Sequence, residues 1–271
     1  YTELGRMQSE SGGGRFFQRM LNDSAELQVG FEVIHEDRRG GIDLDKDPEE
    51  TELTEWIEST RKAITLDWNH VLDGNQYYRV QISHAQLDRD TYYGGGFDPN
   101  AYGSTENPHT NVSATYHVQV ENHNLLGGVQ YERDEIDDYH PGYDHRIKLD
   151  YDVWGFFVQD DFKVTDQFSI LAGLRADNHS AVSDTIVSPR LSAMFSVNNN
   201  FRIRANYAKG FKAPVVFDED LHITISGGDP TFHFNDPDLK EETATSYSLS
   251  AEFTNQTEDY AFRFETNGFY T

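Results

Sequence analysis

Apolar and polar residues alternate one by one along most of this chain, and this pattern constrains the fold more than any other feature. Residues 27–33, 112–120 and 168–176 each place apolar side chains on one face and polar or small side chains on the other. Side chains of an extended strand point to alternate faces, so each run predicts a β-strand. About twelve such runs follow one another, and helical periodicity is scarce. The sequence predicts an all-β fold, an antiparallel up-and-down meander.

The connections between these runs alternate in length. Short polar turns lie at residues 22–24, 73–75, 121–123, 165–167, 198–200 and 255–259. Long polar segments lie between them, at about 36–60, 88–110, 133–152, 178–188 and 208–245. In a meander, this order places the short turns at one end and the long loops at the other. Membrane barrels sort their connections in this way, whereas a soluble sandwich has no reason to do so. We therefore expect a transmembrane β-barrel.

The run from Trp154 to Phe162 has the length that a membrane strand needs. Its two end aromatics share a face with Phe156 and Val158, and the eight residue steps from one to the other rise about 26 Å. Asp160 falls on the same face, close to a short turn, where a charge facing lipid costs little. The opposite faces of the strands predict a wet, charged interior, since they carry Arg79, Arg175, Arg202, Arg204 and Arg263.

The composition excludes several classes of protein. The chain has no cysteine, which rules out disulfides and thiolate metal sites. It has 22 basic and 47 acidic residues, a net charge of −25, and much of the acid lies in residues 36–58, 132–152 and 218–242. Clustered Lys and Arg would be needed to bind nucleic acid, so no such partner is expected. We interpret the acidic blocks as loops.

Five segments in the second half resemble the barrel of TonB-dependent outer-membrane receptors. Residues 207–214, Tyr-Ala-Lys-Gly-Phe-Lys-Ala-Pro, match the most specific of that family's patterns. The other matching segments are 155–163 around Phe-Val-Gln-Asp, 171–177 with Ala-Gly-Leu-Arg, 188–191 with Ser-Pro-Arg, and 235–247. The last segment departs from the pattern at Asp236, which is inserted, and at Glu241, which replaces a proline. Residues 34–41 and 92–96 also resemble receptors close to the cobalamin-receptor group.

The resemblance implies a barrel of about 22 strands, filled by an N-terminal plug that contacts TonB. With about twelve strands and no plug, residues 1–271 are interpreted as one partial barrel domain. The implied function is capture of a ferric siderophore, cobalamin or similar chelate by long extracellular loops, for TonB-energised uptake. The implied location is the outer membrane of a Gram-negative bacterium, with outer-membrane lipid, the chelate and TonB (through the plug) as partners. A passive porin or adhesin barrel and a soluble acidic β-sandwich that binds glycans are the alternatives.

The chain contains no hydrolytic or redox constellation, so no enzyme is expected. Aromatic and histidine side chains in the predicted loops are candidates for ligand binding, because exposed aromatics beside polar groups make adaptable binding surfaces. Packing between neighbouring loops is their alternative role. The candidates are Tyr92, Tyr93, Phe97, Tyr143, Phe217, His222, Phe232 and His233.

Three carboxylates on alternate residues, Asp43, Asp45 and Asp47, form the best candidate metal site. Carboxylates spaced in this way can converge on Ca²⁺. An EF-hand needs glycine at the sixth position, where this chain has Pro48, so that motif is rejected. Calcium bound in an extracellular loop and a solvated acidic loop both remain open.

Overall fold

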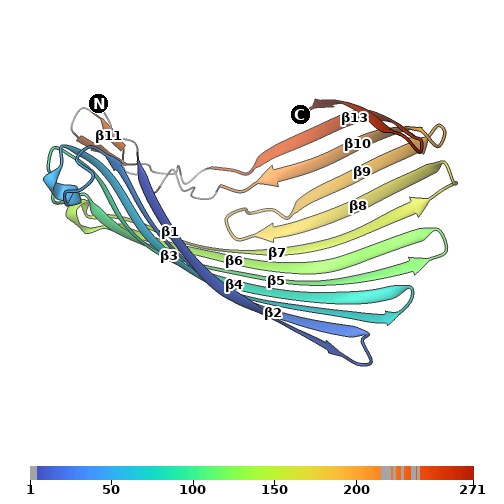
Figure 1. Ribbon diagram of the computed structural model, residues 1–271, viewed down its shortest axis with the longest axis horizontal. Coiled ribbons are helices and arrows are strands. Elements are labelled where there is room, and N and C mark those ends of the chain that lie inside the picture. The colour runs from blue at the N-terminus through green and yellow to red at the C-terminus, as the bar shows by residue number, and fades with distance from the viewer. Residues whose placement is uncertain (1–4, 215–220, 222–223, 227–228, 233–235, 237–238) are drawn as a thin grey trace.

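The computed structural model describes residues 5–214, 221, 224–226, 229–232, 236 and 239–271. Twelve strands form one antiparallel sheet in which each strand pairs with its neighbours along the chain, while β11 and β12 form a separate two-stranded hairpin (Figure 1). The strands of the large sheet are β1 (Arg6–Met20), β2 (Ala25–Gly41), β3 (Leu53–Asp73), β4 (Gln76–Gly95), β5 (Tyr102–Val120), β6 (His123–His140), β7 (His145–Lys163), β8 (Phe168–His179), β9 (Ile186–Ser196), β10 (Phe201–Lys212), β13 (Glu242–Gln256) and β14 (Ala261–Tyr270). The predicted all-β meander is confirmed.

The sheet is open, with β1 and β14 at its two edges. Its short turns lie together at the right of Figure 1 and its longer connections lie at the left, as the sorted turn lengths predict. The small hairpin joins β11 (Thr224–Ser226) to β12 (Asp229–Thr231). Two short 3₁₀ turns, η1 (Pro48–Glu50) and η2 (Pro141–Tyr143), lie among the connections. Within the described residues, no helix is long and apolar enough to cross a membrane.

The predicted extent of the long loops was wrong. Most of residues 133–152 belong to β6 and β7, and only residues 141–144 connect these strands. The loop predicted at 88–110 shrinks to 96–101, and the loop predicted at 36–60 shrinks to 42–52. Charged side chains occur on both faces of these strands where they continue beyond the apolar part of the sheet. High acid content alone therefore does not distinguish a loop from a strand whose faces are both exposed to solvent.

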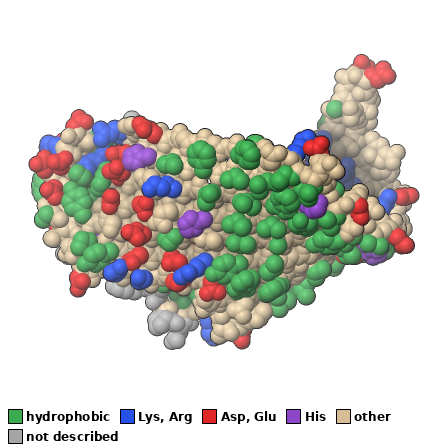
Figure 2. Space-filling model, turned by 90° about the horizontal axis from the view of Figure 1, so that it is seen from below, with side chains coloured by type: hydrophobic (Ala, Val, Ile, Leu, Met, Phe, Trp, Pro, Cys, Tyr) green, Lys and Arg blue, Asp and Glu red, His purple; other side chains and the backbone are tan. Residues whose placement is uncertain are grey.

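Large apolar side chains cover the outer face of the sheet near its short turns. Phe31 is 64% exposed, Phe156 and Val158 are each 57% exposed, and Leu249 is 60% exposed. In Figure 2 hydrophobic side chains gather towards the short-turn end, while charged side chains dominate the loop end. An exposed apolar surface of this kind marks contact with lipid or another apolar partner. We call it the apolar band.

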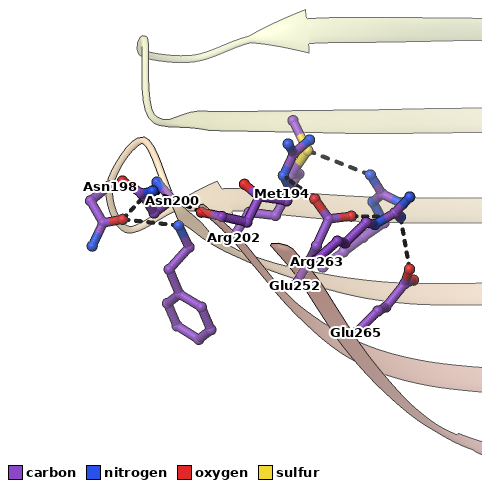
Figure 3. A network of polar contacts seen from close by, with 10 residues as sticks. Met194, Asn198, Asn200, Arg202, Glu252, Arg263 and Glu265 are labelled. Carbon is purple, nitrogen blue, oxygen red and sulfur yellow. Dashed lines mark hydrogen bonds and ion pairs between the residues drawn. The ribbon is translucent and has the colours of Figure 1, made fainter. Parts of the chain in front are cut away.

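The inner face carries the arginines predicted for a wet interior, and carboxylates accompany them. Arg79 Nε lies 2.9 Å from both Asp67 carboxylate oxygens. Figure 3 shows a second network, where Arg263 Nη2 donates to Glu252 Oε2 and to Glu265 Oε2, at 2.8 Å each. Arg202 Nε lies 3.1 Å from the other oxygen of Glu252. These pairs allow charged groups to line the sheet without leaving them unpaired.

Asp160 lies on the outer face, as the alternation predicts, and is paired there. His123 Nδ1 lies 2.7 Å from Asp160 Oδ2. The imidazole ring of His123 also stacks on Phe162, with ring centroids 4.3 Å apart and planes 3° from parallel. A partner and an aromatic cover reduce the cost of placing this carboxylate beside lipid.

Candidate ligand-binding rim

Three connections meet at the loop end of the sheet, and we call residues 42–52, 96–101 and 141–144 the rim cluster. The backbone N–H of Gly96 donates to the carbonyl of Glu52 at 2.7 Å, which joins the first two connections. The hydroxyl of Tyr143 donates to Asp98 Oδ2 at 2.8 Å, which joins the second and third. Hydrogen bonds between loops fix their relative positions. The rim cluster is therefore one packed unit rather than three independent loops.

Tyr92 and Tyr93 lie inside this unit, with exposures of 0% and 5%. The hydroxyl of Tyr92 donates to the backbone carbonyl of Asp98 at 2.9 Å, and its ring packs edge-on against Tyr102 at 4.9 Å. Burial, aided by the Asp98 carboxylate, raises the pKa of Tyr92 to about 12. This position corresponds to packing between loops, the alternative role considered above. A direct ligand contact by either tyrosine stays a prediction.

Tyr143 and Phe232 connect the rim cluster to the segment that follows β12. Their ring centroids lie 5.6 Å apart in an edge-on arrangement, and Phe232 also lies 4.5 Å from the ring of His145. Burial and the hydrogen bond to Asp98 raise the pKa of Tyr143. Burial and the neighbouring His140 lower the pKa of His145. The structure thus brings two predicted ligand residues together through aromatic contacts.

Phe97 differs from the other candidates, because its side chain is 58% exposed. Its φ is +63°, in the left-handed region, which is a genuine outlier for a bulky residue. The backbone N–H of Phe97 donates to the carbonyl of Thr51 at 3.3 Å. Strained backbone of this kind persists only where the surroundings impose it, and it clusters at binding sites. Phe97 is therefore held in this conformation with its ring exposed at the rim.

The sequence interpretation missed a buried polar group beneath the rim cluster. Thr105 Oγ1 donates to Asp138 Oδ1 at 2.6 Å, and the other Asp138 oxygen lies 3.4 Å from His140 Nε2. The side chains of Asp138 and His140 are 2% and 1% exposed. A Cβ on Gly103 would lie 2.2 Å from the His140 ring, so glycine leaves room for it. Asp138 and His140 share a face of β6, a signal that the interpretation of this segment as a loop concealed.

Two of the three candidate calcium residues pair with basic side chains. Asp43 Oδ2 lies 2.7 Å from Lys46 Nζ, and Asp45 Oδ1 lies 3.7 Å from Arg6 Nη1. Asp47 immediately precedes η1. Among the described residues, no group of three or more histidine, aspartate or glutamate side chains is placed to hold a metal ion. Calcium binding stays a prediction. Phe217, His222 and His233 lie outside the described residues.

Comparison with known families decides the class of this sheet. The family described as "TonB dependent receptor-like, beta-barrel" matches residues 11–271. The chain belongs to this family. It is therefore part of an outer-membrane protein of a Gram-negative bacterium. The family is one of transport receptors. The soluble β-sandwich alternative is wrong, because the twelve main strands form one continuous sheet and the family is that of a membrane barrel.

The chain is similar to parts of several larger receptors. It is 28% identical over 117 residues to the probable TonB-dependent siderophore receptor PirA of Acinetobacter baumannii, which covers 40% of this chain and 15% of that protein. It is 26% identical over 190 residues to the iron-regulated outer membrane virulence protein of Vibrio cholerae, which covers 65% of this chain and 28% of that protein.

The fold is shared with solved receptor structures. The siderophore receptor PirA from Pseudomonas aeruginosa superposes with a TM-score of 0.72 at 15% identity, over 92% of this chain and 44% of that chain. The chain thus spans less than half the length of these proteins. Its open sheet is the counterpart of part of their barrel.

Proposed function

We propose that this chain forms the ligand-capturing part of an outer-membrane receptor that imports a ferric siderophore or a similar iron chelate. The observation that carries the proposal is the family match over residues 11–271. Relatives in that family include proteins named as a siderophore receptor and a ferrienterobactin receptor. In this proposal uptake is energised by TonB. Cobalamin is the competing cargo, because two segments of the chain resemble that group of receptors.

The rim cluster supports capture of a flat, aromatic or polar chelate. Phe97 presents an exposed ring at the loop end, and hydrogen bonds between the connections hold its backbone in place. A ring fixed in this way loses little conformational freedom when a ligand packs against it. Tyr143 and Phe232 lie in the same region but are packed against neighbouring side chains. We therefore assign the first ligand contact to Phe97 and a positioning role to the other two.

The inner face supports passage of a polar chelate along the sheet. Its arginines are neutralised by carboxylates, as in the Arg79–Asp67 and Arg263–Glu252 pairs. Paired charges attract a ligand less strongly than bare ones and so let it leave again. A polar interior of this kind suits a water-filled path rather than a packed core.

Uptake by the full-length receptor tests the proposal. The gene would be expressed in a Gram-negative strain that lacks its own ferric catecholate, ferric hydroxamate and cobalamin receptors, with and without TonB. Cells are supplied with radiolabelled iron as a ferric catecholate or as a ferric hydroxamate. We expect TonB-dependent accumulation of iron from at least one of these two chelates. Accumulation of labelled cobalamin alone would replace the iron proposal with the competing cargo. Uptake that is independent of TonB would instead favour a passive porin.

Substitution of Phe97 tests the assigned contact. We expect Phe97→Ala to weaken binding of the transported chelate by about three- to tenfold, the size of one aromatic contact, while Phe97→Tyr retains it. Phe17→Ala is the matched control, because Phe17 is similarly exposed (56%) but lies near the short turn at the other end. Equal affinity in Phe97→Ala and in the unmodified receptor would remove Phe97 from the site.

A further inference from the structure

Two arginines face each other at the loop end of the first two strands. Arg6 of β1 lies directly opposite Arg39 of β2, and the next partner across the sheet is Trp56 of β3. The row continues through Tyr92 to Tyr102. Like charges placed directly opposite each other destabilise a sheet. A row of two arginines beside three aromatics therefore needs a reason beyond strand pairing.

Arg39 is the buried member of the arginine pair, since only 4% of it is exposed. Its Nη2 donates to the backbone carbonyl of Lys46 at 2.9 Å, and its Nε is buried without a hydrogen-bond partner. Among the described residues, no carboxylate forms an ion pair with it. Burial, together with the nearby Arg6, lowers the pKa of Arg39. A buried guanidinium that lacks a counter-ion is costly, so this group is suited to accept an anion.

A cavity of about 460 Å³ opens over the arginine pair. Arg6, Arg39, Trp56 and Tyr102 line it, and the segment from Leu44 to Pro48 forms its side. Asp37, Asp45 and Asp47 line it too. Asp45 is fully exposed and Asp47 is exposed, whereas Arg39 is buried. Asp37 is half-buried, and its charge offsets part of the charge of Arg39 without forming an ion pair with it. The acidic groups with the greatest exposure are screened by water, and the buried positive charge is not.

We propose that this cavity binds a small oxyanion, a carboxylate or a phosphate, between Arg39 and Arg6. A guanidinium matches the two oxygens of such a group and can hold both of them. Trp56 and Tyr102 supply a flat apolar wall for any ring that carries the anion. Phe97 does not line this cavity, and the existence of the site does not depend on which chelate is imported.

The position of the cavity indicates where the anion comes from. Arg39 follows Val33, an exposed residue of the apolar band, by six residues, a rise of about 20 Å along the strand. Phospholipid headgroups lie close to the hydrocarbon region, and even a tilted strand carries Arg39 beyond them. The anion therefore arrives from the surrounding water rather than from the bilayer.

Titration of the purified full-length receptor with inorganic phosphate and with benzoate tests this site. Calorimetry should show saturable binding of at least one anion, and the variants R39M and R6Q should weaken it about tenfold or more. R38Q is the matched control, because Arg38 lies beside Arg39 but is exposed and paired with Glu36 at 2.8 Å. Absence of saturable binding, or binding by both R39M and R6Q equal to that of the unmodified receptor, would overturn the proposal.

Two further readouts distinguish anion binding in the cavity from loop collapse and from lipid binding. R6Q leaves the hydrogen bond from Arg39 to Lys46 intact and removes only a long, solvent-exposed pair with Asp45, so we expect the segment around Lys46 to keep its position. The titration is also repeated in nanodiscs of phosphatidylcholine with and without phosphatidic acid. We expect the same affinity for inorganic phosphate in both. If the thermal stability of the receptor rose when phosphatidic acid was present in the nanodisc but not when inorganic phosphate was added, the assignment to a water-borne anion would be overturned.

Discussion

The two halves of β7 follow the same alternation with opposite chemistry. Near the short turn, its outer face carries Trp154, Phe156 and Val158, which are 46–57% exposed. Towards the loop end, the same face carries Asp150, whose carboxylate lies 2.8 Å from Arg133 Nη2. The change falls beside Trp154, whose ring lies 4.7 Å from that of Tyr131 on β6. A single strand thus passes from lipid into water without ending.

This comparison explains how a membrane barrel supports a binding site. The bilayer constrains the apolar half, because charged substitutions on its lipid-facing side destabilise the barrel. The loop half stands in water, where its outer face can carry ion pairs such as Arg146–Asp137, at 2.7 Å. Its inner side buries the Asp138–His140 pair and Tyr93, whose ring lies 6.4 Å from that of His140. The strands extend the barrel wall upward and place the rim cluster above the membrane.

A charge placed in the apolar half should have the largest effect. Val158→Arg puts a guanidinium on a face that contacts lipid, midway between Trp154 and Phe162, and a charge near the centre of the bilayer costs about 2–4 kcal/mol. Denaturant unfolding of the receptor in lipid vesicles measures the loss. Lys148→Gln on the same face of the loop half is the control, with an expected change within about 0.5 kcal/mol. Equal effects of the two substitutions would contradict the division of β7.

A methyl group added beneath the rim should have the next largest effect. Gly103→Ala places a Cβ 2.2 Å from the buried His140 ring, and overpacking of this kind costs about 1–3 kcal/mol. Hydrogen exchange should show faster opening at residues 138–145. Gly173→Ala is the control, because its nearest neighbour would be at an ordinary 3.6 Å. If exchange in Gly103→Ala matched that in Gly173→Ala, the close packing of His140 would be refuted.

Acidification should loosen the loop half selectively. The pKa of His145 in the folded protein is lowered from 6.5 by burial and by the neighbouring His140. Above pH 6.5 the imidazole is neutral in both states, and the fold keeps its full stability. As the pH falls from 6.5 through the folded-state pKa, the unfolded state takes up the proton first, and stability is lost.

Hydrogen exchange corrected for its intrinsic pH dependence should therefore show faster opening at residues 139–146 at pH 5.5 than at pH 7.5. Residues 154–162 should keep the same protection at both pH values. His145→Gln should reduce the pH dependence of residues 139–146. A pH response that is equal in both halves would assign the effect to the whole barrel.

Loss of one outer ion pair should have the smallest effect. Arg146→Gln removes an exposed pair, and exposed pairs contribute little because water and salt screen them. We expect a smaller change in unfolding stability than for Gly103→Ala, and one that disappears at high salt. A large, salt-independent loss would show that the outer pairs of the loop half are structural.

The sequence predicted the strands and turns well, because alternation and turn chemistry are local signals. It also predicted that Asp160 would face outward, but its pairing with His123 depends on the neighbouring strand. The loop boundaries were wrong because acid-rich segments such as 133–152 were interpreted from composition instead of alternation. The arrangement of the rim could not be predicted, since the bond from Tyr143 to Asp98 joins residues 45 positions apart. Among the candidate ligand residues that the structure describes, only Phe97 has the exposure expected of a surface contact.

The lipid boundary crosses β7 near Trp154, and a cysteine scan tests its position directly. Residues 1–271 contain no cysteine. Once any cysteine in the rest of the receptor has been replaced, single spin labels can be placed at positions 146, 148, 150, 152, 154, 156 and 158 without background. Accessibility to oxygen and to a water-soluble nickel complex is then measured in the receptor reconstituted in lipid. We predict that nickel accessibility dominates up to position 152 and that oxygen accessibility dominates from position 154. Nickel accessibility along the whole series, or oxygen accessibility reaching position 146, would contradict the account.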